Sequence, residues 1–153
     1  MNQHLLSQSE INHYHDEGFL IPQLTLEGSE IEELKHAVDR VLEANSGIRP
    51  EQLISVHIDR LNDEGVRGDR AFFELAKHPK ILDCVEQLIG PDIILWGCQL
   101  FCKPGGDGME VPMHQDGNYW PIRPLVTCTA WVAIDESNID NCLLYTSPSP
   151  RDP

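Results

Sequence analysis

The chain has 153 residues, and its 25 Asp and Glu against 11 Lys and Arg give a formal net charge of −14 at pH 7. Such a surplus of carboxylates repels polyanions and anionic lipid. We therefore do not expect a protein that binds nucleic acid or a membrane surface. Hydrophobic residues make up 41% of the chain, enough for a folded core, so disorder of the whole chain is excluded too.

The N-terminus has neither the basic start nor the long apolar run of a signal peptide, and no later apolar stretch approaches membrane-spanning length. We therefore expect a cytoplasmic protein. The five cysteines show no CxxC spacing, which favours free thiols over a zinc site or a disulfide framework.

Two capping-box patterns predict helices in the first third of the chain. Ser7–Glu10 predicts a helix that runs to about His15 and ends before Gly18, and Phe19–Pro22 resembles a brief strand. Ser29–Glu32 predicts the start of a longer helix. The apolar residues that recur on it at helical spacing are Ile31, Leu34, Val38, Val41 and Leu42.

Residues 46–70 show little periodicity and predict loop around a possible short strand at 54–58. Phe72, Phe73 and Leu75 suggest one helical turn, and the apolar spacing of 81–89 predicts a helix that stops at Gly90-Pro91.

The pattern changes after Pro91. Residues 93–96, 100–101 and 126–134 are strand-like, with β-branched and aromatic residues. Helices first and strands afterwards predict an α+β fold without an internal domain boundary.

His114 and Asp116 are the residues with the clearest chemical potential. If 111–116 is extended, the two side chains project from one face of the strand and could hold one metal ion. With one further histidine they would form a 2-His-1-carboxylate triad, which leaves positions open on Fe(II). The alternative is a surface histidine beside a turn-capping aspartate, since short motifs often match by chance.

An ordered string of motifs surrounds this pair, after an N-terminal helix, Glu17–Pro22 and a long Glu-rich helix. It consists of Gly90-Pro91, Gln99, Lys103-Pro104-Gly105, His114-Gln115-Asp116-Gly117, Tyr119-Trp120, Pro124, Thr129–Ala133, Asp135 and Asn141. In these motifs the chain resembles the phytanoyl-CoA dioxygenase family of Fe(II)/2-oxoglutarate oxygenases. The resemblance covers most of residues 7–141.

The resemblance implies a double-stranded β-helix (a cupin-like jelly roll) faced by N-terminal helices, with a helical part at 1–90 and the first barrel strands at 91–141. It implies that His114 and Asp116 are the first two iron ligands, and that Gln99 and Trp131 line the 2-oxoglutarate pocket. Tyr119 and Trp120 could wall a substrate pocket, with ordinary packing as the alternative.

The implied reaction uses Fe(II), 2-oxoglutarate and O₂ to hydroxylate a small organic or acyl substrate, with succinate as the second product. An aspartate at 116 favours hydroxylation, since related halogenases have a small residue there. The expected partner is a small molecule, and the sequence leaves the oligomeric state open.

The chain departs from the family after Asn141. The family continues with a distal iron histidine and an arginine for 2-oxoglutarate, whereas no histidine follows His114 here. Residues 142–153 match one reading frame of a transposase-type sequencing adapter, with a natural Ser/Pro-rich tail as the alternative. We therefore expect a partial domain at 1–141, truncated before the barrel closes and inactive alone, followed by a non-native tail.

Two other functions stay open at this stage. One is a non-catalytic jelly-roll scaffold or binding protein that has lost its iron site. The other is a cupin-like metal dioxygenase that uses the same ligands without 2-oxoglutarate. Residues in the missing half would separate the scaffold from the oxygenase, and keto-acid decarboxylation would separate the two enzymes.

Overall fold

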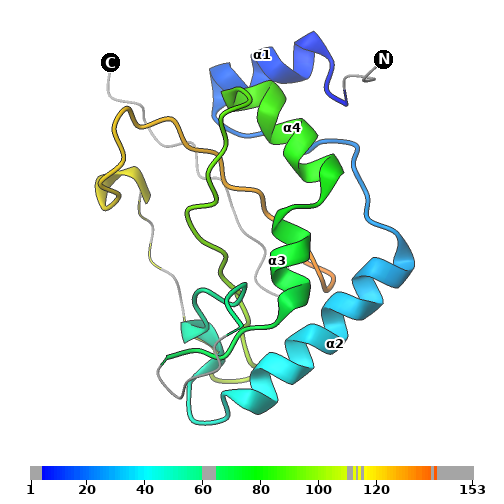
Figure 1. The fold of residues 1–153 in the computed structure, drawn as a ribbon, viewed down its shortest axis with the longest axis vertical. Helices are drawn as coiled ribbons and strands as arrows, with labels where there is room; N and C mark the ends of the chain where they lie inside the picture. Colours follow the sequence, from blue (N-terminus) through cyan, green and yellow to red (C-terminus); the bar gives the residue numbers. More distant parts are fainter. Residues whose placement is uncertain are drawn as a thin grey trace.

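The computed structural model of the chain describes residues 5–59, 65–109, 112, 114, 116–138 and 140 (Figure 1). The expected tail from residue 142 lies outside the described residues. The helical elements are α1 (Gln8–Glu17), α2 (Gly28–Ala44), η1 (Pro50–Gln52), α3 (Arg70–Ala76), α4 (Pro79–Ile89) and η2 (Asp116–Asn118), where η denotes a 3-10 helix.

The first helix forms as its capping residues predict. The Glu10 N–H donates to Ser7 Oγ at 3.3 Å, and the Ser7 N–H donates to Glu10 Oε2 at 2.7 Å. Gly18 ends α1 in the left-handed region, with φ of 82°, and its N–H donates to the Tyr14 carbonyl. A residue with a Cβ would be strained at this position.

The second helix is also confirmed, but its predicted cap is wrong. The Glu27 N–H donates to Glu30 Oε2 at 2.7 Å, so Glu27 is the N-cap and Ser29 lies inside the first turn. A capping box pairs the cap with the third helical residue, and the Glu27–Glu30 pair meets this condition two residues before the predicted pair. The helix thereby begins at Gly28.

The core lies where α2 meets α3 and the loop between them. Its buried members are Leu34, Ala37 and Val41 of α2, Leu53, Val56 and Val66 of the loop, and Phe72 of α3. Loop side chains thus supply much of the apolar interior. Cys98, Leu100 and Ile134 pack against this cluster from the second half of the chain, which ties that half to the helices.

Two residues, Asn45 and Gly68, fix the loop between α2 and α3 in place. Asn45, buried at the end of α2, donates through Nδ2 to the carbonyls of Val41 (2.7 Å) and Arg67 (2.8 Å) and accepts the Arg67 N–H at 2.8 Å. At Gly68, a Cβ would lie 2.3 Å from the Val56 carbonyl oxygen, so only glycine fits. The described residues of the predicted loop, 46–59 and 65–69, are therefore held by specific contacts of the fold.

The last α-helix, α4 (Pro79–Ile89), packs against α1 at one end of the molecule (Figure 1). Gly90 ends it with φ of 93°, as the Gly90-Pro91 signal predicts. The Leu6 N–H donates to Gln87 Oε1 at 3.1 Å and links the N-terminal segment to this helix. None of the helices in the described ranges has the length and apolar character needed to cross a bilayer.

After Pro91 the described residues form turns, the 3-10 helix η2 and segments without regular structure, and the described part of the chain contains one isolated antiparallel bridge, between Ile54 and Gln99. Phe19–Pro22 is not a strand, since the structure assigns it no pairing. The strand-like segments 93–96 and 126–134 likewise lack a ladder among the described residues. The α+β jelly roll stays a prediction.

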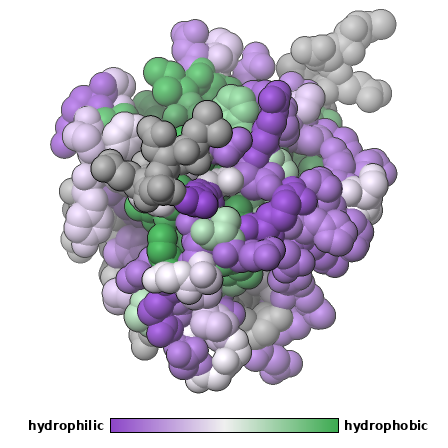
Figure 2. All heavy atoms as spheres, turned by 60° about the horizontal axis from the view of Figure 1, so that its bottom comes forward, coloured by the Kyte–Doolittle hydropathy of each residue, from purple (hydrophilic) through white to green (hydrophobic). Residues whose placement is uncertain are grey.

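Burial nevertheless alternates as in a strand. From Cys98 to Pro104, half-buried and exposed residues follow each other strictly, with Cys98 and Leu100 against the core and Gln99 and Phe101 outside. This period of two is typical of a sheet with one covered face. Figure 2 shows the surface from another side, with hydrophobic side chains reaching solvent among hydrophilic ones.

Candidate metal centre

His114 and Asp116 meet in the structure. His114 Nε2 lies 3.1 Å from Asp116 Oδ1, and His114 Nδ1 lies 2.8 Å from the Pro112 carbonyl oxygen. A carbonyl only accepts, so Nδ1 carries a hydrogen and donates it to Pro112. In the protonated ring Nε2 also donates and forms an ion pair with Asp116, whereas in the neutral ring Nε2 has a lone pair available to a metal ion.

This arrangement fits a metal ion. Two acceptors 3.1 Å apart repel unless a proton or a cation lies between them. Donor atoms about 2.1 Å from an octahedral ion lie about 3.0 Å apart on adjacent positions, which matches the observed separation. The Pro112 carbonyl also orients the ring as outer-shell acceptors orient metal-bound histidines.

The same contacts change the pKa of the His114 imidazole. The hydrogen bond to the Pro112 carbonyl, followed by the charge and hydrogen bond of Asp116, raises the pKa of His114. Both side chains are accessible, with 42% of His114 and 50% of Asp116 exposed. A cation from solvent can therefore reach the pair.

The backbone that brings the pair together is not a continuous strand. Asp116 opens the 3-10 turn η2, closed by the Tyr119 N–H on the Asp116 carbonyl at 3.0 Å. The proposed extended stretch 111–116 therefore ends before Asp116, and part of it lies outside the described residues. The turn still directs the carboxylate toward His114.

The two predicted 2-oxoglutarate residues lie on neighbouring segments. Phe101 stacks on Trp131 with ring centroids 5.4 Å apart, and Gln99 is two residues before Phe101, on the same exposed side. Gln99 and Trp131 therefore share the face that points away from the helical core. No described hydrogen bond joins either residue to His114 or Asp116.

The predicted substrate-pocket residues follow the turn directly. Tyr119 is 74% exposed, whereas Trp120 is half-buried. Arg123 donates to the carbonyls of Ile122 at 2.6 Å and Trp120 at 3.4 Å, which fixes the chain just after them. Arg123 therefore bonds to backbone carbonyls close to it in the sequence.

Two contributors to the site were missed by sequence reasoning. The Pro112 carbonyl has no sequence signal, because every residue has a carbonyl oxygen. Phe101 had one, since it stands two residues after Gln99 in an alternating stretch. Within the described part of the chain, no group of three or more metal-ligating side chains converges, and the candidate ligands that the structure brings together are His114 and Asp116.

Comparison with known proteins identifies the family of the chain. The sequence pattern of the phytanoyl-CoA dioxygenase (PhyH) family matches residues 14–148. The chain belongs to the phytanoyl-CoA dioxygenase family. This membership confirms the family resemblance of the motifs.

Curated relatives of this family member are named phytanoyl-CoA dioxygenases. The chain is 35% identical to the human peroxisomal phytanoyl-CoA dioxygenase over 85 residues, 52% of this chain and 25% of the relative. It is 34% identical to a probable phytanoyl-CoA dioxygenase of Caenorhabditis elegans over 87 residues, 52% of this chain and 28% of the relative. The rat peroxisomal enzyme is 23% identical over 169 residues, 97% of this chain and 48% of the relative.

The chain spans about half the length of the curated relatives that it matches most fully, which includes the rat enzyme at 48%. No solved structure matches the chain significantly. The family match runs to residue 148, and the expected non-native tail from residue 142 stays a prediction.

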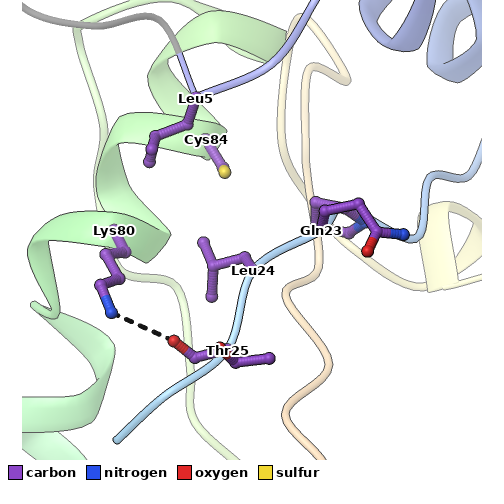
Figure 3. Close-up of a pocket in the computed structure, with 7 residues that line it drawn as sticks. Leu5, Gln23, Leu24, Thr25, Lys80 and Cys84 are labelled. Atoms are coloured by element: carbon purple, nitrogen blue, oxygen red, sulfur yellow. Dashed lines mark hydrogen bonds between the residues drawn. The ribbon is translucent and has the colours of Figure 1, made fainter.

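One cavity of this family member lies apart from the metal pair. It has a volume of about 190 Å³ and lies between α4 and residues 22–25, beside Leu5 (Figure 3). The Lys80 ammonium donates to the Thr25 carbonyl at 3.1 Å across its edge. Burial raises the pKa of the Cys84 thiol, which lines this cavity. None of the candidate site residues lines this cavity.

Proposed function

We propose that this chain carries the first two iron ligands of an Fe(II)- and 2-oxoglutarate-dependent dioxygenase that hydroxylates a small organic or acyl substrate. The observation that carries the proposal is the 3.1 Å approach of His114 Nε2 to Asp116 Oδ1, with Nδ1 held by the Pro112 carbonyl. Family membership supports the oxygenase class.

The proposed roles follow from the chemistry of these groups. His114 would offer its Nε2 lone pair and Asp116 its carboxylate, and the hydrogen bond to Pro112 would keep the ring in the binding tautomer. When bound by two histidines and one carboxylate, Fe(II) supplies open positions for 2-oxoglutarate and O₂. We propose that the whole protein supplies the second histidine.

The proposed fold is the α+β jelly roll. In support, Cys98, Leu100 and Ile134 pack on the helical core, whereas Phe101 and Trp131 on the other side are about half exposed. A sheet in a barrel has one face toward its surroundings and one toward the interior. We propose that the face with Gln99 and Trp131 is the interior one, where they would line the 2-oxoglutarate pocket.

Metal binding by this chain tests the ligand pair. We expect Co²⁺, an oxygen-stable substitute for Fe(II), to bind with an affinity that His114→Ala and Asp116→Asn each reduce at least about tenfold. The matched control is His36→Ala, which removes an exposed histidine of α2 and should leave the affinity unchanged. Equal Co²⁺ affinity in all four proteins contradicts the proposal.

Activity of the intact protein tests the reaction. We expect succinate formation that requires 2-oxoglutarate and is abolished by His114→Ala or Asp116→Ala. Turnover that persists in both variants removes the hydroxylase proposal. Iron binding with O₂ uptake but no decarboxylation of 2-oxoglutarate indicates the cupin-like dioxygenase instead.

A further inference from the structure

An ion-pair cluster links the helical half of the chain to the glycine-rich loop that precedes the metal pair. The Arg49 guanidinium contacts Glu51 through Nη2 (3.0 Å to Oε1) and Nε (3.3 Å to Oε2). Arg49 Nη2 also donates to the Asp107 carbonyl at 3.0 Å, and the Met109 N–H donates to Glu51 Oε1 at 3.0 Å. We call these four residues the Arg49–Glu51 clasp.

The clasp is more than a surface ion pair. Only 9% of the Glu51 side chain is exposed, against 75% for Asp107, so the shared carboxylate is largely shielded from water. Arg49, and then backbone N–H groups that include that of Met109, hold the pKa of Glu51 down to about 2. The carboxylate therefore stays charged over the whole physiological pH range.

The loop that the clasp holds has an intrinsic tendency to be mobile. Residues 103–109 contain Gly105, Gly106 and Gly108, and glycine loses more conformational freedom on ordering than any other residue. Gly106 turns the chain with φ of 97°. Without an anchor, ordering this loop would be a cost to any binding event that depends on the segment after it.

The position of the anchor relates the clasp to the metal pair. Met109 is held by its backbone N–H five residues before His114, and η2 closes the segment again at Asp116. The clasp thus holds the chain five residues before one candidate ligand, and η2 begins at the other.

We propose that Arg49 and Glu51 are positioning residues for the candidate metal centre, which hold Asp107 and Met109 so that His114 and Asp116 are close to their binding positions before a metal ion binds. They do not touch the metal. The inference rests on the proposed function and adds to it the residues that prearrange the ligand pair.

Co²⁺ titration of the full chain tests this role. We expect Glu51→Ala to weaken Co²⁺ binding about tenfold, because the loop must then be ordered during binding. Glu51→Gln keeps an oxygen that can accept the Met109 N–H, so it should restore part of the lost affinity. Hydrogen exchange should show faster exchange at 104–109 in Glu51→Ala than in the wild-type chain.

The matched control is Arg40→Ala. Arg40 is as exposed as Arg49, at 48% against 43%, and it pairs with Asp69 at 2.7 Å and Glu33 at 2.8 Å, away from the loop. Its loss should change the Co²⁺ affinity less than twofold. An equal weakening in Arg40→Ala and Glu51→Ala overturns the inference, because general destabilisation then explains both.

The outcomes also separate the inference from the proposed function. If the wild-type chain binds Co²⁺ through His114 and Glu51→Ala binds it equally well, only the positioning role is overturned. If the wild-type chain shows no Co²⁺ binding that depends on His114, the proposed ligand pair fails and the role of the clasp fails with it.

Discussion

Replacing Asn45 by alanine is the most direct test of how the core loop is held. The side chain is 6% exposed and makes three hydrogen bonds of 2.7 to 2.8 Å, to the Val41 carbonyl and to both backbone groups of Arg67. Its backbone has φ of −123°, which alanine adopts without strain. The substitution therefore removes hydrogen bonds and leaves the backbone conformation unaffected.

The expected loss follows from the number of bonds. Each buried hydrogen bond contributes about 1 kcal/mol net, so Asn45→Ala should lower the free energy of unfolding by about 3 kcal/mol. With a urea m value of about 2 kcal/mol/M, the unfolding midpoint should fall by about 1.5 M. Urea denaturation followed by far-ultraviolet circular dichroism measures this shift.

Two further variants make the test specific. Asn12→Ala removes an exposed amide that accepts a hydrogen bond from Gln8 on α1, and should change stability by less than about 0.5 kcal/mol. Asn45→Asp keeps the acceptor for the Arg67 N–H but loses both donors, and should be at least as destabilising as Asn45→Ala. A loss below about 1 kcal/mol in Asn45→Ala, or wild-type stability in Asn45→Asp, would refute the reasoning.

Two other substitutions test the backbone and the clasp. Gly68→Ala places a Cβ 2.3 Å from the Val56 carbonyl oxygen and should lower the free energy of unfolding, measured by urea denaturation, by about 1 to 3 kcal/mol. Gly47→Ala should leave this free energy unchanged, because no atom lies within 4 Å of the added Cβ. Equal stability of the two variants would contradict the close approach. Glu51 has its pKa lowered from 4.5 to about 2, first by Arg49, so its stabilising effect is complete above pH 4.5 and is lost as the pH falls toward 2. The difference in unfolding free energy between the wild-type chain and Glu51→Gln should therefore be constant above about pH 5 and shrink below it; a difference that does not vary between pH 6 and pH 2.5 would exclude this linkage.

The helices could be predicted from sequence because their signals are local. Ser7 and Gly18 lie within a few residues of the groups that they cap, and the apolar spacing of 81–89 describes one helix face without reference to any neighbour. The incorrect cap at Ser29 marks the limit of this approach. Ser29–Glu32 matches the Ser-x-x-Glu pattern, but the structure uses Glu27 and Glu30, and glutamate is not a residue type that the pattern places at the cap.

The strands could not be predicted in the same way. A strand needs a partner, and the pairing of Ile54 with Gln99 joins residues from distant parts of the sequence that carry no shared signal. Phe19–Pro22 has a strand-like composition, but the structure assigns it no pairing, and its strand propensity alone did not produce a strand.

For the site, the sequence by itself singled out the candidate ligand pair. The spacing of His114 and Asp116, together with the surrounding motifs, identified the pair and the family, because two ligands from one short segment are close in any compact conformation. The tertiary structure decided how they are oriented: the Pro112 carbonyl holds the ring, and Glu51 holds the loop from 58 residues away. Backbone carbonyls and long-range ion pairs have no sequence pattern, since they depend on where the folded chain brings distant atoms together.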